Sequence, residues 1–563
     1  MTVAKHTNQS DDTLEKVRAY HNRTKHTFDG YARGPETIDW SAQPDSFRRY
    51  EGAARVELPM PQAENPIGYN GLYQARDITP AEFTLETISQ CLRLSLGLTA
   101  WKEYQGSRWS LRCNPSSGNL HPTEAYLINL NLTALSNGVY HYNSYEHALE
   151  QRAGFDTEGN NKADVASATQ TDQPLLLMAL TSITWREAWK YGERAYRYCQ
   201  LDIGHALAAI RYACALQGWE IVLLNEWSDD DIAKLTGIDR AQDFADAEAE
   251  VPDLLIGIKP YTSSTPPLVH NPDATLARFA NSHWAGQANV LDSKHLYDWP
   301  IIDEVIQATV KPRLPPSAPE TPPQTHYPAP VVCDSPHSAQ LVIERRRSAQ
   351  AYDGQTNIDK QQFFRILDML LPRTDTPPWD CIPWQATTHL LLFVHRIQGL
   401  KPGLYLLARR ADAVAELKQV MASDKFDWHS VEDCPEHIPL YHLVDANCQK
   451  ASAALSCQQR IASDGVFSVS MLAEFDATLA ESAWRYRQLY WEAGCIGQVL
   501  YLEAEAIDLQ GTGIGCYFDD AVHDMLGLKA SRFQAMYHFT LGGAYNDPRL
   551  RTLAPYHHLQ RGS

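Results

Sequence analysis

A proline-rich segment divides the 563-residue chain near its middle. Residues 312–336, PRLPPSAPETPPQTHYPAPVVCDSP, contain nine prolines in twenty-five positions. Because proline lacks the amide donor that helices and sheets use, such a segment favours an extended, semi-rigid spacer. The chain is also longer than one hydrophobic core usually supports. We therefore expect an N-terminal extension at 1–75, a first domain at 76–311, a linker at 312–337 and a second domain at 338–563.

The two sides of the spacer repeat one pattern of elements. Helical apolar spacing occurs at 84–98 and again at 359–372. At 138–152 and at 403–418 we expect a strand, a polar turn and then another short strand or the start of a helix. Each side then carries a long apolar helix with a central glycine, Gly204 or Gly494. A mid-helix glycine costs about 1 kcal/mol relative to alanine. We expect another helix or a ligand to come close there, with an ordinary helix crossing as the alternative. The pattern predicts a duplicated α+β unit.

Charge and cysteine usage exclude several classes of function. The net charge of −19 argues against nucleic-acid and anionic-membrane partners, because both are polyanions. The longest apolar runs are far shorter than a membrane span, and the first residues do not resemble a secretory signal. Eleven cysteines occur without CxxC pairs or Cys/His metal spacing. We expect reduced thiols in a cytoplasmic protein, with no metal site and no structural disulfide.

One polar loop motif occurs only in the first half. Residues 112–128 read RCNPSSGNLHPTEAYLI, so a stiff loop between two prolines precedes a strand-like run. The loop carries Pro115, Ser116, Ser117 and Asn119, which offer several short hydrogen-bonding groups. The matching place in the second half reads CIPWQATTHLLLF, with no such motif. The loop therefore predicts a binding site that the second half does not duplicate.

A basic motif occurs only in the second half. Residues 344–354 read ERRRSAQAYDG, and the matching place in the first half reads NGLYQARDITP. The guanidinium groups of Arg346 and Arg347 can grip phosphate oxygens in a bidentate way, and the Ser348 hydroxyl adds a donor. A solvated charge cluster is the alternative reading of such a run. The motif predicts an anion site that complements the loop of the first half.

Together the two motifs resemble the nitroreductase-like flavoprotein superfamily. In that family an Arg-Arg-Ser triplet of one subunit holds the phosphate of FMN, and a Pro-Ser-Ser loop comes from the other subunit. The resemblance implies an α+β fold in which two tandem nitroreductase-like domains form an intramolecular pseudo-dimer. It also implies one FMN site, built from both halves, with Gln350 beside the triplet. A second site would have decayed.

Two further segments resemble the same family. The segment LQGTGIGCYFDD at 509–520 is similar to the one that presents backbone N–H groups to the isoalloxazine ring, which implies a role for Gly513, Ile514 and Gly515. A dinucleotide fingerprint is the weaker reading, because these glycines follow a helix and lack the G-x-G-x-x-G spacing. The closing segment resembles the family's basic tail. Arg549 and Arg551 would then complete the phosphate pocket, with a surface position as the alternative.

The segment WREAWKYGERAYRYCQLDIGH at 185–205 resembles one branch of the superfamily, the SagB-type azoline dehydrogenases. These enzymes oxidise thiazoline or oxazoline rings of modified peptides to aromatic azoles. The resemblance implies that Lys190 and Tyr191 form an acid/base pair, in which a lysine ammonium would favour the phenolate. An ordinary helix start is the alternative. His121 lies in the loop and could donate to flavin or substrate, whereas His205 is expected to be a core histidine.

Three functions remain open from the sequence. The first is an FMN-dependent dehydrogenase that acts on an azoline-like heterocycle, either a small molecule or part of a peptide. The second is a nitro- or quinone reductase that takes hydride from NAD(P)H. The third is a degenerate scaffold without catalytic activity. A chain that contains its own pseudo-dimer is expected to be monomeric or to form a higher homo-oligomer.

Overall fold

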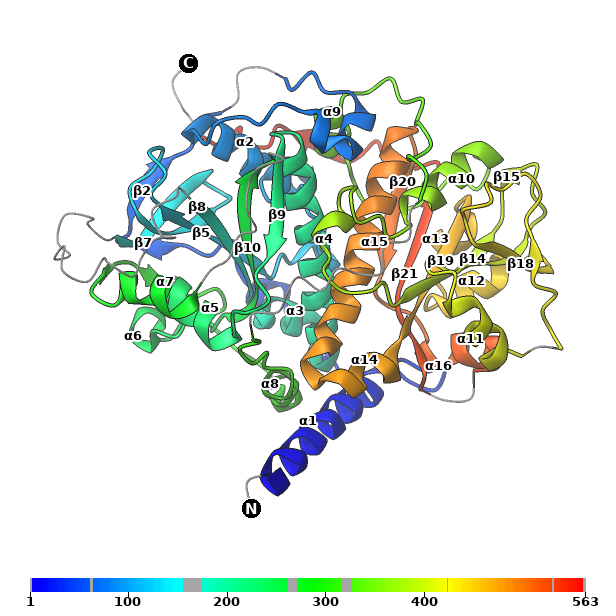
Figure 1. Ribbon diagram of the computed structural model, residues 1–563, viewed down its shortest axis with the longest axis horizontal. Coiled ribbons are helices and arrows are strands. Elements are labelled where there is room, and N and C mark those ends of the chain that lie inside the picture. The colour runs from blue at the N-terminus through cyan, green and yellow to red at the C-terminus, as the bar shows by residue number, and fades with distance from the viewer. Residues whose placement is uncertain are drawn as a thin grey trace.

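The computed structural model describes residues 3–60, 64–154, 175–261, 271–315, 327–422, 424–528 and 531–559. Part of the expected linker, residues 316–326, lies outside this range. Two antiparallel sheets dominate the fold and lie apart from each other in Figure 1. The first contains β2 (Ala54–Glu57), β5 (Thr123–Leu130), β6 (Gly138–Asn143), β7 (Ala148–Gly154), β8 (Leu175–Ser182), β9 (Trp219–Leu223), β10 (Val251–Pro260) and β11 (His283–Trp284). The second contains β14 (Thr388–Val394), β16 (Gly403–Leu407), β17 (His429–Ser430), β18 (Leu440–Asp445), β19 (Phe467–Glu474), β20 (Gln510–Ile514) and β21 (Phe533–Gly542).

The two sheets share one strand order. The first runs β7-β6-β5-β8-β10-β9, and the second runs β18-β16-β14-β19-β21-β20. The central strands β5 and β8 are buried along their whole length, and so is β14. The apolar runs of β8 and β14 fit this position, because both faces of the sheet are covered. The strands expected at 138–152 and from 403 form as β6, β7 and β16, and of the two alternatives after β16 the helix forms, as α11 (Ala413–Val420).

Two long helices pack against each other between the sheets. Helix α4 (Ala195–Ala215) adjoins the first sheet and α15 (Tyr486–Ala506) the second, and every residue of both helices is buried (Figure 1). A Cβ atom on Gly204 would lie 2.2 Å from the Trp491 carbonyl oxygen, and one on Gly494 would lie 2.2 Å from that of Leu201. The two central glycines therefore let the helix backbones touch, which confirms the expected close approach.

The remaining helices surround the sheets. They are α1 (Val3–Arg23), α2 (Leu85–Ser95), α3 (Thr184–Tyr191), α5 (Asp229–Thr236), α6 (Ala241–Phe244), α7 (Pro272–Phe279), α8 (Pro300–Ala308), α9 (Ala339–Arg345), α10 (Lys360–Met369), α12 (Gln449–Leu455), α13 (Ile461–Asp464), α14 (Phe475–Glu481) and α16 (Asp519–Leu526). Helices α2 and α10 are those expected from apolar spacing. Each begins at a capping box, Thr84 with Thr87 and Asp359 with Gln362. No helix in the described part of the chain is long and apolar enough to cross a membrane.

Three small sheets complete the fold. Strand β1 (Tyr50–Glu51) pairs with β12 (Gln287–Ala288), and β13 (Ile358–Asp359) pairs with β15 (Ile397–Gln398). The hairpin of β3 (Leu98–Tyr104) and β4 (Ser107–Arg112) receives β22 (Arg551–Leu553) as a third strand. The C-terminal tail therefore leaves the second sheet and ends on the first half.

The N-terminal segment crosses in the opposite direction. The Asp519 carboxylate of the second half accepts hydrogen bonds from the His26 amide and from Arg197, at 3.0 and 2.7 Å. Arg194 also pairs with Asp519. Burial alone would raise the pKa of Asp519, but the two guanidinium groups outweigh it and hold that pKa well below its usual range. The two halves are thus joined by buried ion pairs as well as by the helix contact.

One expectation from the cysteine pattern is wrong. Cys457 and Cys516 form a disulfide, with their Cα atoms 5.8 Å apart. The other nine cysteines are free thiols. The two partners are fifty-nine residues apart in the sequence, so no local spacing marked them as a pair. Sheet β19-β21-β20 brings the end of β20 to the loop after α12, where Cys457 lies.

Candidate active site between the two halves

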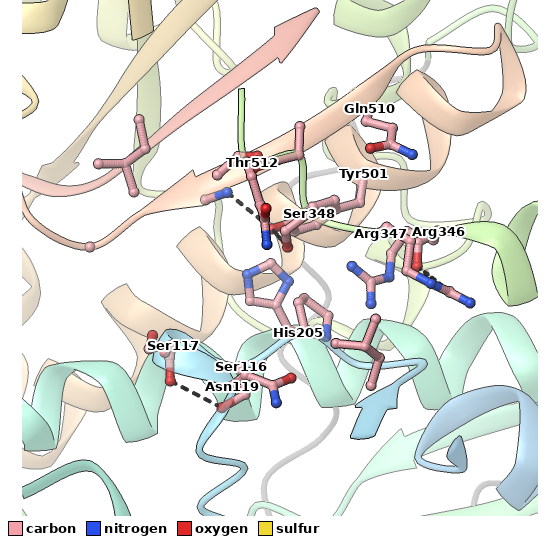
Figure 2. A pocket seen from close by; sticks show the side chains of 18 of the residues that line it. Ser116, Ser117, Asn119, His205, Arg346, Arg347, Ser348, Tyr501, Gln510 and Thr512 are labelled. Atoms are coloured by element: carbon pink, nitrogen blue, oxygen red, sulfur yellow. Dashed lines mark hydrogen bonds between the residues drawn. The ribbon is translucent and has the colours of Figure 1, made fainter. Parts of the chain in front are cut away.

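A cavity of about 430 Å³ lies between the two halves, near the contact of α4 and α15. Its lining includes the loop of the first half, with Ser116 and Asn119, and the basic segment of the second half, with Arg346 and Ser348. In Figure 2 the labelled loop residues lie on one side, Ser348 and Thr512 lie on the other, and His205 lies between them. The structure therefore brings together the two motifs that the sequence holds more than two hundred residues apart.

The loop adopts a backbone that its sequence permits. Gly118, Asn119 and His121 all have left-handed φ values, of 60°, 61° and 53°. Glycine and asparagine tolerate this region best, which explains their place in the motif. The Asn119 side chain donates to the Ser110 carbonyl oxygen at 2.9 Å, and the Ser116 hydroxyl oxygen accepts from the His121 amide at 2.8 Å. The short polar side chains thus fix the loop as well as line the cavity.

A buried charge network anchors the loop from behind. Arg186 on α3 donates to the His121 carbonyl oxygen at 2.7 Å and also to the Glu124 carboxylate. Glu124 accepts from His141 at 2.9 Å, and His141 bonds to Glu150 at 2.9 Å through its other ring nitrogen. Burial alone would lower the pKa of His141, but the two carboxylates outweigh it and raise that pKa to about 9. The imidazolium is thus the stable form in the folded protein.

The raised pKa of His141 gives the folded protein a pH-dependent stability. The pKa of His141 is about 9 in the folded protein, whereas a histidine in the unfolded chain has a pKa near 6.5. Its contribution to the free energy of unfolding is therefore complete below pH 6.5 and is lost as the pH rises through 9. We expect the free energy of unfolding to fall by about 2–3 kcal/mol across that window. Urea unfolding of the wild type and of His141→Gln from pH 6 to 9.5 measures it. Equal pH slopes in the two proteins would contradict the assignment.

Arg346 and Arg347 bring positive charge to the cavity, and the Glu505 carboxylate attracts both groups without a hydrogen bond to either. Arg346 donates to the carbonyl oxygens of Cys113 and Arg112 in the other half, at 3.1 and 2.9 Å. Arg347 also donates only to carbonyl oxygens, including that of Thr99 at 3.1 Å. Burial lowers the pKa of both groups, and that of Arg347 falls to about 10. Within the described residues neither guanidinium pairs with a carboxylate, and Nη1 of Arg346 has no hydrogen-bond partner. Two such cations form a site for an anion.

The glycine segment of β20 lies beside Ser348 and lines the wall that faces the loop of the first half. The Tyr501 hydroxyl bonds to the Ser348 hydroxyl at 2.8 Å and accepts from the Gly513 amide at 3.0 Å. A Cβ atom on Gly513 would lie 1.7 Å from the Tyr537 hydroxyl, and one on Gly515 would lie 2.3 Å from the Tyr198 ring. These glycines are required because the backbone runs against aromatic rings. Ile514 and Gln350 also line the cavity.

Filling the space at Gly513 should therefore damage the cavity wall. Gly513→Ala would drive the new methyl group into Tyr537, whose hydroxyl lies 3.2 Å from the His205 ring nitrogen. We expect a loss of about 1–3 kcal/mol in the free energy of unfolding and weaker ligand binding at this wall. Adding Tyr537→Phe removes the nearest clashing atom and should restore part of the stability. Thermal and urea unfolding of the single and double variants measure this, and an unaffected single variant would contradict the geometry.

Tyr191 and Lys190 differ in position. Tyr191 lines the cavity, and its hydroxyl would lie 2.5 Å from a Cβ atom on Gly118 of the loop. Lys190 does not line it; its ammonium lies 5.3 Å from the Tyr191 ring centre and 5.6 Å from that of Trp40. Burial raises the pKa of Tyr191 well above its usual value, and Glu187 adds to this rise. The expected shift towards the phenolate is therefore wrong. Burial lowers the pKa of Lys190.

Two buried carboxyl groups lie beneath the loop. Glu187 accepts from the Ser116 hydroxyl at 3.5 Å, and Asp202 on α4 accepts from the Ser117 amide at 3.2 Å. The second oxygen of each carboxyl group has no partner among the described residues. Burial raises the pKa of both groups, and the charge of Asp202 raises that of Glu187 further. The pair can therefore hold a proton near neutral pH.

Two of the expected cavity residues are not brought to the cavity. Arg549 pairs with Asp547 at 2.6 Å, and Arg551 lies 3.8 Å from Glu103. Both side chains are about 70% exposed, because the tail turns outward to form β22. Their position on the surface is the alternative that the sequence left open.

The sequence reasoning missed other residues that line the cavity. They include Lys102, Arg112, Tyr198, Asp202, Tyr501 and Tyr537. His205, expected in the core, is buried and bonded through both ring nitrogens to Gln498 and Tyr537, yet it also lines the cavity. Asp202 is the only acidic residue of α4, which could have marked it. Tyr501 and Tyr537 carried no such signal, because tyrosines are common in buried elements.

Comparisons with known proteins place this fold. The nitroreductase family model matches residues 75–246. A “putative nitroreductase” of Methanocaldococcus jannaschii is 22% identical over 166 residues, 29% of this chain and 79% of that protein. A solved “putative nitroreductase” from Anabaena variabilis is 21% identical and covers 94% of this chain and 99% of its own, with a TM-score of 0.61. One from Exiguobacterium sibiricum in complex with FMN is 14% identical and covers 38% of this chain and 92% of its own, with a TM-score of 0.23. The Anabaena structure shows that nearly the whole chain shares its fold.

The cavity fits the cofactor that this family implies, which is FMN. A phosphate would supply the anion that Arg346 and Arg347 lack, and it would give Nη1 of Arg346 an acceptor. Gly513 and Gly515 line the cavity without a side chain, so a flat ring could lie against their backbone. Over residues 75–246 the chain is therefore similar to the nitroreductase family.

Proposed function

We propose that this protein is an FMN-dependent dehydrogenase of the SagB type, which oxidises an azoline-like heterocycle to an azole. One observation carries the proposal: a single cavity joins the loop of the first half, the basic segment of the second half and Tyr191. In this account the units at 76–311 and 338–563 arose by duplication and pair as a pseudo-dimer, with 1–75 as an extension and 312–337 as the linker. The shared strand order of the two sheets supports this.

The position in α4 that matches Tyr501 of α15 supports a single flavin site. Arg211 lies seven residues after Gly204, just as Tyr501 lies seven after Gly494. Instead of binding a serine and a glycine amide, Arg211 forms a bidentate pair with Asp380, at 2.8 and 2.7 Å. The turn that carries Asp380 (Trp379–Cys381) packs against β9. An ion pair and a turn thus occupy this counterpart position. A separate cavity of about 290 Å³, lined by Trp384, Arg409 and Glu492, lies at the matching loop, but no Arg-Arg-Ser segment borders it.

The chemistry divides between cofactor and protein. FMN, when bound, supplies the hydride acceptor. The protein must orient the heterocycle, exclude water and take up the proton that leaves the ring carbon. Tyr191 stays protonated and donates a hydrogen bond to the substrate, because burial raises its pKa. Lys190 lies behind Tyr191 and outside the cavity lining, so it receives the proton through the Tyr191 hydroxyl group.

Rapid mixing of the yellow protein with NADPH tests the proposal against a reductase. A dehydrogenase should show no fast bleaching of the flavin at millimolar NADPH, whereas a thiazoline-containing peptide should bleach it under anaerobic conditions. Fast bleaching by NADPH, without any by the peptide, would favour a nitro- or quinone reductase. A purified protein without bound flavin would contradict both activities and favour a scaffold.

A further inference from the structure

We propose that the Cys457–Cys516 disulfide is a second redox centre, which exchanges two electrons with the cofactor in the adjacent cavity. This inference rests on the proposed FMN site. It adds an electron acceptor within the chain, so that substrate oxidation can continue past one turnover before an external acceptor is needed.

The disulfide lies at the wall where the cofactor fits. Cys516 directly follows Gly515 and lines the same cavity as Arg346 and Ser116. Gln459, two residues after Cys457, also lines it and donates to the Cys516 carbonyl oxygen at 3.2 Å. The two segments that carry Cys457 and Cys516 therefore both reach the cavity, and no other element lies between Cys516 and the cavity.

The disulfide also differs from most of the other cysteines in its accessibility. Cys457 and Cys516 are half-buried, as is the free Cys434, whereas the other eight free cysteines are buried. Cys457 and Gln458 have consecutive left-handed φ values, of 52° and 61°, which non-glycine residues adopt at a cost. Exposed disulfides held by a strained backbone are the ones that reduce readily. A purely structural crosslink would not need to face a redox cavity.

The exchange balances in atoms and electrons. Reduced FMN in its anionic form gives up two electrons and one proton, and the S–S bond accepts the two electrons as it breaks. The products are oxidised FMN, one thiol and one thiolate, and the thiolate takes a second proton from solvent. The dithiol returns to the disulfide by thiol–disulfide exchange with an external low-molecular-weight disulfide, which becomes reduced.

An anaerobic dithionite titration of the FMN-loaded protein counts the electrons. We expect the wild type to take up about four electrons per FMN before excess dithionite appears, two for the flavin and two for the disulfide. Cys516→Ser and Cys457→Ser should each take up about two. Cys434→Ser, which alters the half-buried free thiol, is the matched control and should still take up about four.

Labelling of free thiols at each step of the dithionite titration shows whether the disulfide is reduced. After substoichiometric dithionite, peptide mass mapping should find label on Cys457 and Cys516 while part of the flavin is still oxidised. Uptake of about two electrons by wild type with the disulfide intact would overturn this inference and leave the proposed function standing. If Cys457 and Cys516 remain unlabelled when the flavin is fully reduced, that result would also overturn the inference and leave the proposed function standing. A chain that binds no FMN would overturn both.

Discussion

Replacing Arg346 with alanine should strip FMN from the protein. The side chain supplies a buried guanidinium with an unpartnered Nη1, and it joins the basic segment to the loop backbone at Arg112 and Cys113. Charge-assisted hydrogen bonds of this kind contribute about 2–3 kcal/mol, so the dissociation constant should rise about 30- to 150-fold. Fluorescence titration of the apoprotein with FMN measures this change.

Two controls separate a lost phosphate contact from a lost fold. Arg551→Ala removes a guanidinium that is 71% exposed and lies outside the cavity, so its affinity for FMN should match that of the wild type. Circular dichroism and a thermal melt of Arg346→Ala should show a folded chain. Full flavin occupancy in Arg346→Ala at equimolar FMN would show that the phosphate lies elsewhere.

The second large effect is expected at Tyr191. Tyr191→Phe should keep the flavin spectrum and lower the rate of substrate-dependent flavin reduction by about 10²- to 10⁴-fold, the usual contribution of a positioned proton donor or acceptor. The hydroxyl faces the loop at Gly118 within the cavity, and the ring packs edge-on against Tyr198, 4.7 Å between centres. Phenylalanine keeps this packing and removes only the hydroxyl group. Single-turnover reduction by a thiazoline-containing peptide measures the rate.

A matched control uses a tyrosine that faces solvent. Tyr31→Phe makes the same chemical change at a residue that is 62% exposed, and it should turn over at the wild-type rate. Lys190→Ala should lower kcat with less effect on KM, because the side chain lies behind Tyr191 rather than in the cavity lining. Wild-type rates in both Tyr191→Phe and Lys190→Ala would remove the pair from the mechanism.

The fold could be predicted because its signals are local and repeated. Apolar spacing marked α2 and α10, and the mid-helix glycines marked the contact of α4 with α15. The loop and the basic segment could be identified because each is a compact motif. Their meeting in one cavity required the further inference that the two halves face each other across the long helices.

The features that the sequence did not reveal depend on contacts between distant residues. The disulfide joins residues fifty-nine positions apart, and the tail with Arg549 and Arg551 turns outward because β22 pairs with β3. The state of Tyr191 also depends on tertiary burial. Its sequence neighbour Lys190 suggested a lower pKa, but burial together with Glu187, three residues before Lys190, raises it. The sequence neighbour Lys190 predicted the wrong direction for the pKa shift of Tyr191, because adjacency in the sequence does not show how deeply a side chain is buried.

The stoichiometry of bound flavin tests the central claim, one cofactor site made jointly by the two halves. The purified protein should be saturated with FMN, freed of excess ligand and denatured, and the released chromophore should be quantified against the chain. The account predicts about one FMN per chain, because the counterpart position holds the Arg211–Asp380 ion pair and lacks an Arg-Arg-Ser segment. Two FMN per chain would show two complete sites, and none would show that the cavity does not bind the cofactor; either result would contradict the account.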